Sequence, residues 1–447
     1  SQVHIQRDYL LEKLKAGMKS PLIKVIIGVR RCGKSYLLFN IFYDYLKSIN
    51  VREDHIIKIR LDELKNAALR NPVKLSSYIN ERILNDGEKY YILLDKIQEC
   101  VKIANPDFLD NEGNLIEGIS VDESYLTYHD VLNELLNIEY VDCYVTGSNS
   151  RLLSSDLPTE FRNRNYNIEV FPLSFKELHQ AFPDMQYDEL WNEYITYGGM
   201  PLAVLNRSVQ SKQNYLKDLF EGTYFKDIKE RYGLRDEASI DDVTDIVASC
   251  IGSPLNPGKI ENTFKSRKTS NITDNTISNY LKYLENSFLI KEAKRYDVKG
   301  RKYIGTLSKY YFTDIGLRNA RLNFRQIEES HIMESIIYIE LVRNGYSVDV
   351  GQVESWIQDP DTKKRCRVNY EVDFIVNEGN RKYYIQSAVE LSTIEKVKKE
   401  QKSLMKIDDN FRKIIIVKGF RNPLYNDDGI LVIGLYNFLM DVKIIEQ

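Results

Sequence analysis

The stretch GVRRCGKS at residues 28–35 constrains the fold more than any other part of this sequence. An apolar, β-branched run, LIKVIIG (22–28), precedes it, and a helical pattern follows from Lys34 to about Leu46. Glycines let the backbone curl so that successive N–H groups face one anion, and the start of the helix adds unpaired N–H groups and a positive dipole end. The spacing G-x-x-x-x-G-K-S therefore predicts a phosphate-binding loop between a strand and a helix.

This loop supplies the candidate nucleotide ligands. In such a loop the lysine, here Lys34, reaches the β- and γ-phosphates of ATP, and the following hydroxyl, Ser35, ligates Mg²⁺. Cys32 is interpreted as a loop position whose main chain binds phosphate, with a reactive thiol as the alternative. ATP and Mg²⁺ are the predicted cofactors. The predicted nucleotide-binding residues are Gly28, Arg31, Cys32, Gly33, Lys34, Ser35 and Tyr36.

Three more apolar runs, at 55–61, 90–95 and 140–149, alternate with helical patterns. Such runs are typical of a parallel sheet buried on both faces. A phosphate loop needs a carboxylate on a neighbouring strand to orient the metal, and Asp95 ends the run YYILLD. Thr146 and Asn149 close the next strand. Asn149 is predicted to orient the attacking water, with a helix N-cap as the alternative role.

Two arginines, Arg162 and Arg164, follow the last of these strands in the segment TEFRNRNYNIEVF. Negative charge builds on the phosphoryl oxygens in the transition state, and an arginine from a neighbouring subunit can stabilise it. The alternative is that both are solvated loop arginines.

The order of motifs along the chain resembles that of prokaryotic AAA-superfamily ATPases with a conserved, poorly characterised C-terminal domain. The motifs are GVRRCGKS, YILLDKIQE, YVTGSNSRLLSSD, EFRNR, VFPLSFKE, YGGMP, YFKDIKERYG and YYFTDIGLRNARLNFR. The resemblance covers nearly the whole chain and implies an α/β fold with an AAA-type parallel sheet core. It further implies a sensor role for Asn149, an arginine-finger role for Arg162 or Arg164, and a homo-oligomer, with a hexamer as one form. The implied domains are an ATPase core (1–170), a helical lid (171–238), a winged-helix module (239–322) and a restriction-endonuclease-like domain (323–447).

One residue departs from the family pattern, which reads Leu-Asp-Glu-[Ile/Val]-Gln around the second motif. Lys96 stands where the family has the glutamate that polarises the attacking water. A protonated lysine cannot act as a general base, and a nearby triphosphate holds its pKa up. We therefore expect ATP binding with turnover reduced by about 10²–10⁴-fold. Glu99, one helical turn further on, is a weaker substitute.

A basic region lies at residues 259–309. It contains 12 Lys/Arg and five Asp/Glu, a net charge of +7, whereas the whole chain has a net charge of −3. A helix with an N-cap at Thr273 and a following hairpin, AKRYDVKGRKY, resemble the reading helix and wing of a DNA-binding module. The alternative is a solvated basic face that contacts protein. The predicted DNA-contacting residues are Lys265, Arg267, Lys268, Arg295, Lys299, Arg301 and Lys302.

The C-terminal part resembles a PD-(D/E)xK nuclease core. That chemistry uses a helix glutamate, a strand aspartate and a second acid two residues before a lysine, with the acids holding Mg²⁺. Glu334 and Asp373 suit the first two places, but Gln386 and Ala388 occupy the other two. Glu390 and Lys396 are more distant substitutes. A scaffold or binding role is therefore favoured over an active nuclease.

Composition limits the remaining possibilities. Apolar residues make up 43% and charged residues 28% of the 447, as in ordinary globular proteins. No apolar run is long enough to span a bilayer, no signal peptide is evident, and the five cysteines lie far apart. We expect a cytoplasmic protein without a membrane partner. The leading interpretation is an ATP-dependent switch or motor that engages DNA or protein; the alternatives are a nucleotide-gated interaction protein with little turnover and an ATP-gated nuclease.

Overall fold

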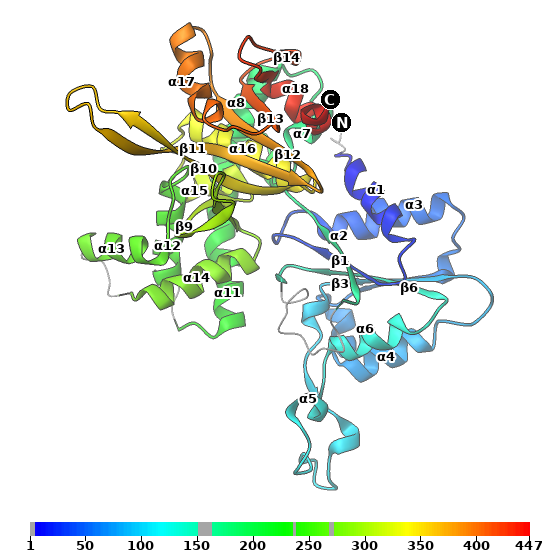
Figure 1. Ribbon diagram of the computed structural model, residues 1–447. Helices are drawn as coiled ribbons and strands as arrows, with labels where there is room; N and C mark the ends of the chain where they lie inside the picture. The colour runs from blue at the N-terminus through cyan, green and yellow to red at the C-terminus, as the bar shows by residue number, and fades with distance from the viewer. Residues whose placement is uncertain (1–4, 151–162, 236–237, 268–271) are drawn as a thin grey trace. The chain divides into compact units, whose positions relative to one another are not determined.

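The computed structural model describes residues 5–150, 163–235, 238–267 and 272–447 (Figure 1). The chain divides into two compact units, one of Arg7–Val170 and one that contains Phe171–Gln447. The predicted domain boundaries, including the one after residue 170, stay a prediction. Residues 171–447 form one compact unit, so the three modules expected inside it stay a prediction.

The first unit is a five-stranded parallel sheet with helices on both faces (Figure 1). In order across the sheet, the strands are β2 (Ile56–Arg60), β3 (Tyr90–Asp95), β6 (Val141–Gly147), β1 (Ile23–Ile27) and β7 (Asn165–Glu169). Every residue of β1 and β3 is buried, which explains their continuous apolar sequences. The four predicted strands are confirmed, and β7 is an additional one.

The helices of this unit follow the predicted alternation with strands. They are α1 (Asp8–Gly17), α2 (Lys34–Tyr36), which continues through a π-helical segment (Leu37–Phe42) into α3 (Tyr43–Ser48), α4 (Pro72–Asn80) and α6 (Tyr128–Leu136). The segment between β3 and α6 also holds short elements, namely β4 (Ile103–Ala104), α5 (Val121–Ser124) and β5 (Tyr125–Leu126), with β4 and β5 antiparallel. Because all five sheet strands are parallel, the loops after β1, β3 and β6 open at one edge of the sheet.

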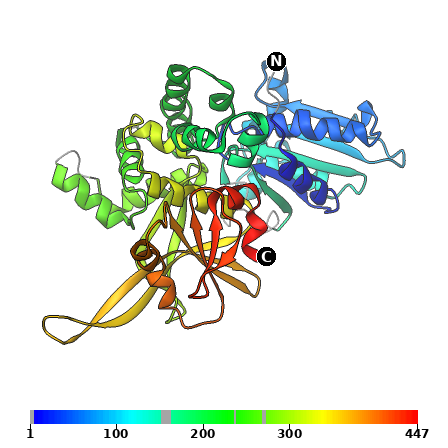
Figure 2. The same ribbon diagram turned by 90° about the horizontal axis from the view of Figure 1, so that it is seen from above.

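The second unit packs helices against one eight-stranded sheet (Figure 2). Its helices are α7 (Phe175–Ala181), α8 (Tyr187–Tyr197), α9 (Pro201–Leu205), α10 (Val209–Leu219), α11 (Phe225–Tyr232), α12 (Ala238–Ser249), α13 (Pro257–Arg267), α14 (Asp274–Asn286), α15 (Ile315–Arg321), α16 (Glu329–Arg343), α17 (Ile394–Met405) and α18 (Leu435–Met440). Across the sheet the strands are β14 (Leu424–Tyr425), β15 (Leu431–Gly434), β13 (Arg412–Val417), β12 (Arg381–Ala388), β11 (Arg365–Glu378), β10 (Ser347–Gln358), β8 (Ile290–Asp297) and β9 (Lys302–Phe312). The hairpin β8–β9 thus shares a sheet with the C-terminal strands.

Strand β8 makes this connection by pairing in parallel with β10, with Arg295 opposite Val350 and Asp297 opposite Gln352. Helix α14 begins at the predicted N-cap, since the Thr273 side chain accepts a hydrogen bond from the backbone N–H of Thr276. One apolar core then runs from helices α7, α8 and α9 into the C-terminal strands.

Two of the sequence motifs, YGGMP and FTDIG, lock together in this unit. The N–H of Gly199 donates to the Asp314 carboxylate at 2.7 Å, and the same carboxylate caps α15 by accepting from the N–H of Leu317 at 3.1 Å. A Cβ at Gly199 would lie 2.0 Å from the carbonyl oxygen of Leu173. Gly199 is therefore needed for this close backbone approach.

Two further observations concern cysteines and membranes. All five cysteines are free thiols. Across the described ranges, no helix has both the length and the apolar character needed to cross a bilayer.

Candidate nucleotide-binding site

The phosphate loop joins β1 to α2 with backbone angles that its glycines permit. Gly28 has φ 149° and Gly33 has φ 100°, both in the region that favours glycine. A Cβ at Gly28 would lie 2.3 Å from the carbonyl oxygen of Val170. Arg31 also has positive φ, at 75°, and its side chain is exposed, as is that of Tyr36. The loop therefore has a backbone conformation that requires glycine at positions 28 and 33.

Lys34 folds back into this loop. Its ammonium donates to the carbonyl oxygens of Gly28 at 2.8 Å and Val29 at 2.9 Å. Burial lowers the pKa of Lys34 from its usual value. An entering phosphate would offer this buried ammonium a charged acceptor in place of two neutral carbonyls.

Cys32 points the other way, into the core. Its side chain is fully buried, its Sγ donates to the carbonyl oxygen of Val170 at 3.5 Å, and burial raises the pKa of the thiol. A thiol held protonated in the interior is a poor nucleophile. The geometry agrees with the interpretation of Cys32 as a structural loop position.

Asp95 gathers the oxygen ligands of the site. It ends β3, is 1% exposed, and accepts from the Ser35 hydroxyl at 2.9 and 2.8 Å. The Thr146 hydroxyl donates to the same carboxylate at 2.6 Å. The sheet thus brings together the two predicted metal ligands, Ser35 and Asp95, and adds a third oxygen. An all-oxygen donor set of this kind suits Mg²⁺.

Lys96 leaves the strand immediately after Asp95, in a left-handed conformation with φ 57°. Its backbone N–H donates to the Thr146 hydroxyl at 2.8 Å. Its ammonium pairs at 2.8 Å with Asp62, which follows β2, the strand next to β3. Although partial burial opposes it, the hydrogen bond from Lys96 lowers the pKa of Asp62. The place of the expected base is therefore filled by an ion pair.

The remaining predicted catalytic residues are less closely tied to this cluster. Asn149 is buried just past the end of β6, and Arg162 lies outside the described residues. The carbonyl of Arg164 accepts from the N–H of Ile23, at the start of β1, and its side chain bonds Asn133. Arg164 therefore lies at the sheet edge opposite to its own phosphate loop.

The basic region of the second unit presents most of its cations to solvent. Lys265, Arg267, Lys299, Arg301 and Lys302 are exposed, and Lys265 pairs with Glu261 at 2.9 Å. Arg295 is half-buried and donates to Gln352 on β10. Lys268 falls outside the part of the chain that the structure describes.

A second cluster of acids lies in the same unit. Glu334 on α16 and Glu371 and Asp373 on β11 present carboxylate oxygens within 4.8 Å of one another. Lys309 on β9 donates to Glu334 at 3.0 Å and also to Glu371. Burial and then the nearby Glu334 raise the pKa of Asp373 to about 7.

Neighbouring groups complete this acid–lysine cluster. Tyr311 donates to Glu334 at 2.9 Å, and Ser387 donates to Asp373 through its N–H at 2.8 Å and its hydroxyl at 2.9 Å. Gln386 accepts from the backbone N–H of Asp373 at 2.9 Å. Gln386, which stands at the motif acid position, and its neighbour Ser387 therefore support Asp373 structurally.

Sequence reasoning missed Asp62, Glu371 and Lys309. The position of Asp62 could have been predicted, because Asp62 follows a predicted strand of the same parallel sheet and so had to lie at the edge near Asp95. The positions of Lys309 and Glu371 could not, since no fixed sequence spacing links them to Glu334.

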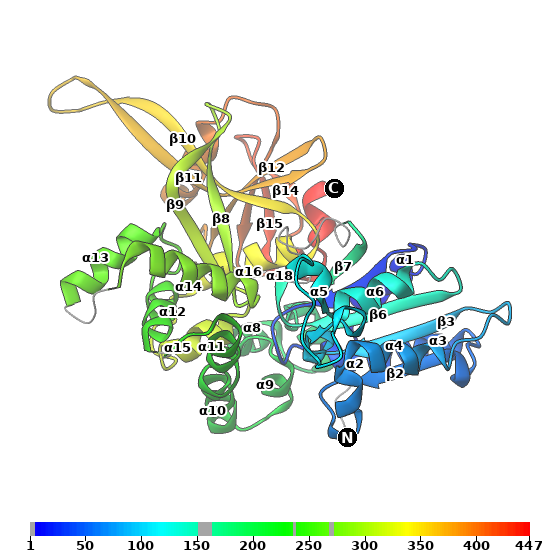
Figure 3. The same cartoon turned by 90° about the horizontal axis from the view of Figure 1, so that it is seen from below.

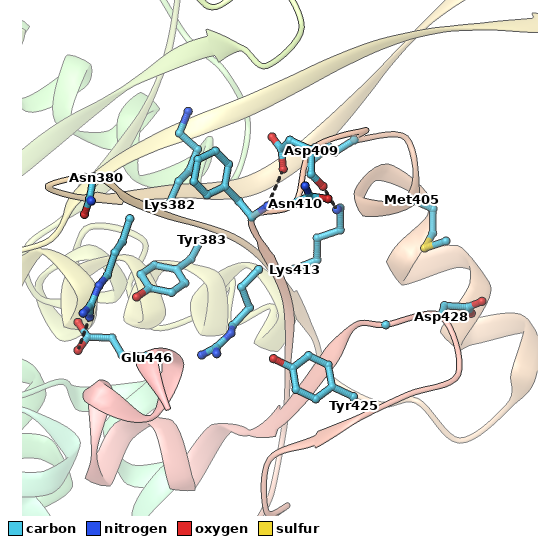
Figure 4. A pocket seen from close by; sticks show the side chains of 15 residues that line it. Asn380, Lys382, Tyr383, Met405, Asp409, Asn410, Lys413, Tyr425, Asp428 and Glu446 are labelled. Carbon is cyan, nitrogen blue, oxygen red and sulfur yellow. Dashed lines mark hydrogen bonds and ion pairs between the residues drawn. The ribbon is translucent and has the colours of Figure 1, made fainter.

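The second unit also contains a cleft of about 740 Å³ where β12 and β13 begin (Figure 4). Its charged lining residues are Arg381, Lys382, Asp409, Arg412, Lys413, Asp428 and Glu446. Arg412 donates to the carbonyl of Ile445 at 2.6 Å, and Lys413 to the carbonyl of Asp409 at 3.0 Å. Four cations and three acids line the cleft, so it offers no strong preference for either charge.

Two family models and several known proteins are similar to this chain. Residues 20–179 match the model of the AAA domain, and residues 188–328 match a domain of unknown function, DUF8612. An uncharacterized protein of Haemophilus influenzae is 32% identical over 444 residues, which cover 98% of this chain and 100% of that protein. The uncharacterized protein MJ1544 of Methanocaldococcus jannaschii is 30% identical over 425 residues, 91% of this chain and 83% of that one. Among solved structures, the Walker-type ATPase PABY2304 of Pyrococcus abyssi aligns with a TM-score of 0.45 and 15% identity, covering 71% of this chain and 96% of that chain.

The parallel sheet, the phosphate loop and the match to the AAA domain define the first unit as an AAA-type P-loop ATPase domain. The chain as a whole belongs to the family that includes the uncharacterized proteins of H. influenzae and M. jannaschii.

Proposed function

We propose that this protein is an ATP-dependent switch that binds Mg²⁺–ATP firmly and hydrolyses it slowly. The phosphate loop from Gly28 to Tyr36 would hold the phosphates, and Ser35 with Asp95 would hold Mg²⁺, which neutralises charge on the phosphates when bound. The observation that carries the proposal is the Lys96–Asp62 ion pair, which occupies the place of the catalytic base.

Slow turnover follows from the charges at this place. A protonated Lys96 cannot take a proton from water, and Asp62, with its pKa lowered by the same ion pair, is a weak base. Lys96 is free enough to change partners, since its side chain is 30% exposed and that of Asp62 is 38% exposed. A γ-phosphate is therefore able to compete with Asp62 for Lys96, which would couple ATP binding to the loop after β2.

The proposal includes assembly into a homo-oligomer, with a hexamer as one form. Arg164 is at the edge of the sheet opposite to its own phosphate loop, so an arginine-finger role requires a neighbouring subunit. Asn149, buried beyond β6, would act as the sensor within its own subunit.

The proposal also includes DNA association through residues 239–322. Helices α12, α13 and α14 precede the hairpin β8–β9, and Leu255 pairs with Ser308 of that hairpin. Three helices followed by a hairpin wing are the layout of a winged helix. The exposed cations of α13 and of the hairpin turn support contacts to phosphates.

A nuclease is the second candidate function, favoured by the position of Lys309 beside Glu334 and Asp373. Lys309 on β9 lies beside the acids and could take the place of the motif lysine that β12 lacks. Its ammonium, however, already pairs with two of the acids, and this favours a structural cluster. Plasmid incubated with the protein and Mg²⁺ or Mn²⁺ tests the point, since cutting that is abolished by Asp373→Asn would establish the nuclease.

Nucleotide binding and assembly test the leading function together. We expect the wild type to bind Mg²⁺–ATP in equilibrium dialysis, and Lys34→Ala and Asp95→Asn to weaken binding by about tenfold or more, as for charged hydrogen bonds. Light scattering should show a larger species with ATP than without it. Binding that is absent in the wild type, or unchanged in both variants, would contradict the proposal.

A further inference from the structure

A two-stranded ribbon projects from the second unit and has no role in the function described so far (Figures 1 and 3). It consists of the outer parts of β10 and β11, which pair from Val353 opposite Tyr370 to Gln358 opposite Arg365. In the same sheet, β8 pairs with β10 only at 350–352, and β12 pairs with β11 only at 374–378. Beyond these pairs the two edges of the ribbon have no neighbouring strand, and its outer part, from Trp356 to Arg365, is largely exposed.

One face of the ribbon carries an exposed tryptophan between arginines. Trp356 lies directly opposite Arg367, and Arg365 is its diagonal neighbour. The guanidinium carbons of Arg365 and Arg367 are 5.5 and 5.3 Å from the centroid of the indole ring. Trp356 is 51% exposed, whereas Trp191, the other tryptophan of the chain, is fully buried. An indole left in solvent at this position suits a partner with a flat aromatic face.

The ribbon is also cationic where it is most exposed. Lys363, Lys364, Arg365 and Arg367 follow one another closely after the turn. Within the turn, the Asp359 carboxylate accepts from the N–H groups of Asp361 at 2.8 Å and Thr362 at 3.3 Å. That acid is thus used to shape the turn.

The turn of the hairpin β8–β9 extends this surface at the base of the ribbon. Strand β8 runs parallel to β10, and the N–H of Val298 donates to the carbonyl of Gln352 at 3.0 Å. The turn cations Lys299, Arg301 and Lys302 are exposed beside it. Residues 298–302 and 354–369 together hold seven Lys/Arg and three Asp/Glu, so the combined surface has a net charge of +4 in a chain of −3.

We propose that the ribbon, together with this turn, binds single-stranded nucleic acid. A row of cations follows a phosphate backbone, and an exposed aromatic ring gives a base a surface on which to stack. Unpaired bases offer both faces to such a ring, while bases inside a duplex are covered by their neighbours. The inference names a partner class and contact residues for the nucleic-acid association proposed above. The contribution of the hairpin turn rests on that proposed association, whereas the contribution of the ribbon rests on the ribbon's own residues.

The two tryptophans allow a direct test with the whole chain. In a Trp191→Phe variant, Trp356 is the reporter, and we expect an oligothymidylate to quench its fluorescence at low salt and a duplex of the same length to do so much less. Anisotropy of a labelled oligothymidylate with the wild type and with Trp356→Ala gives the same comparison without altering the buried Trp191. We expect Trp356→Ala to weaken binding by about tenfold or more.

Charge variants separate the ribbon from the hairpin turn. The double variant Arg365→Ala/Arg367→Ala should weaken binding at least tenfold. It should also make the slope of the logarithm of the binding constant against the logarithm of the salt concentration less steep, by about 0.7 for each phosphate that the protein no longer neutralises. The matched control, Lys398→Ala/Lys399→Ala on the exposed face of α17, should change neither.

Four outcomes would overturn the inference. One is no quenching, and another is equal binding by the arginine variant and its control. The third is quenching that follows protein concentration without nucleic acid, which would make the ribbon a contact between copies of this chain. If Lys299→Ala/Arg301→Ala abolishes binding while the ribbon variants do not, the inference fails but the proposed winged-helix contact stands.

Discussion

Each unit of this protein places a lysine among carboxylates, and the two lysines differ in how firmly they are held. Lys96, in the ATPase domain, is 30% exposed and has one carboxylate partner, Asp62, which is itself 38% exposed. Lys309, in the second unit, is 2% exposed and pairs with both Glu334 and Glu371. Although burial favours the neutral amine, these carboxylates raise the pKa of Lys309 above its usual value.

This difference shows how the same pair of residue types serves two purposes. An exposed ion pair contributes little to stability, so a phosphate can take the lysine at small cost. A buried lysine paired with a buried acid, as Lys309 is with Glu334, cannot leave without stranding that acid in the interior. Lys96 is therefore suited to respond to a ligand, and Lys309 is suited to hold β9, α16 and β11 together.

The largest expected effect comes from restoring the acid at position 96. Lys96→Glu should raise steady-state ATP hydrolysis by about 10²–10⁴-fold, because a carboxylate beside Asp95 is able to activate water. Lys96→Gln, which removes the charge without adding a base, is the control and should stay near the wild-type rate. Equal rates for all three proteins would show that Lys96 does not limit ATP hydrolysis, and its contrast with the structural Lys309 would fail.

Removing the buried lysine should be the next most severe change. Lys309→Met is expected to lower the free energy of unfolding by about 3–5 kcal/mol at pH 8, since the acids lose their counter-charge inside the protein. The cost should shrink at pH 5, where protonation relieves the acids. Denaturant titration measures it, and Lys302→Met, an exposed position on the same strand, is the control. An unchanged free energy of unfolding in Lys309→Met would show that Lys309 contributes no more to stability than Lys96 does.

Asp314 extends the comparison to a buried acid held mainly by backbone N–H groups. Burial raises the pKa of Asp314 to about 6, so its contribution to stability is fully present below its unfolded pKa of about 4 and is lost as pH rises through about 6. The stability of the wild type relative to Asp314→Asn should therefore fall by about 1–3 kcal/mol between pH 4 and pH 7. Urea titrations at several pH values measure this difference. A difference that stays constant, or grows with pH, would refute the expected sign.

Freeing Lys96 should have the smallest effect. Asp62→Asn is expected to change the free energy of unfolding by less than about 1 kcal/mol, as for other exposed ion pairs. It should also tighten ATP binding by roughly fivefold or less, on the same energy scale, while ADP binding stays unchanged, because only ATP has a γ-phosphate for Lys96. Calorimetric titration with both nucleotides measures this, and weaker ATP binding would mean that Asp62 supports the site instead of competing for Lys96.

The first unit could be predicted closely from the sequence because its signals are local. The loop glycines, the apolar runs and the acid at the end of YYILLD each specify one element, and parallel pairing then places Ser35, Asp95 and Thr146 together. Strand β7 was missed since NYNIE alternates polar and apolar residues with only Ile168 fully buried.

The second unit could be predicted only in part because its decisive contacts are distant in sequence. Lys309 and Glu371 are 62 residues apart and come together through the shared sheet. No motif spacing in the sequence predicts this contact. The same holds for the parallel pairing of β8 with β10, which joins two regions that the sequence had assigned to separate modules. Local patterns specified the helices here, such as α14, but not which strands became neighbours.

The nucleotide that stays on the protein tests the central claim most directly. The wild type would be mixed with Mg²⁺ and ATP labelled in the adenine ring, separated from free nucleotide, and its bound nucleotide identified over an hour. The Lys96–Asp62 pair in place of a base predicts that the bound nucleotide remains ATP, while in Lys96→Glu it becomes ADP. Rapid conversion to ADP on the wild type would contradict the account.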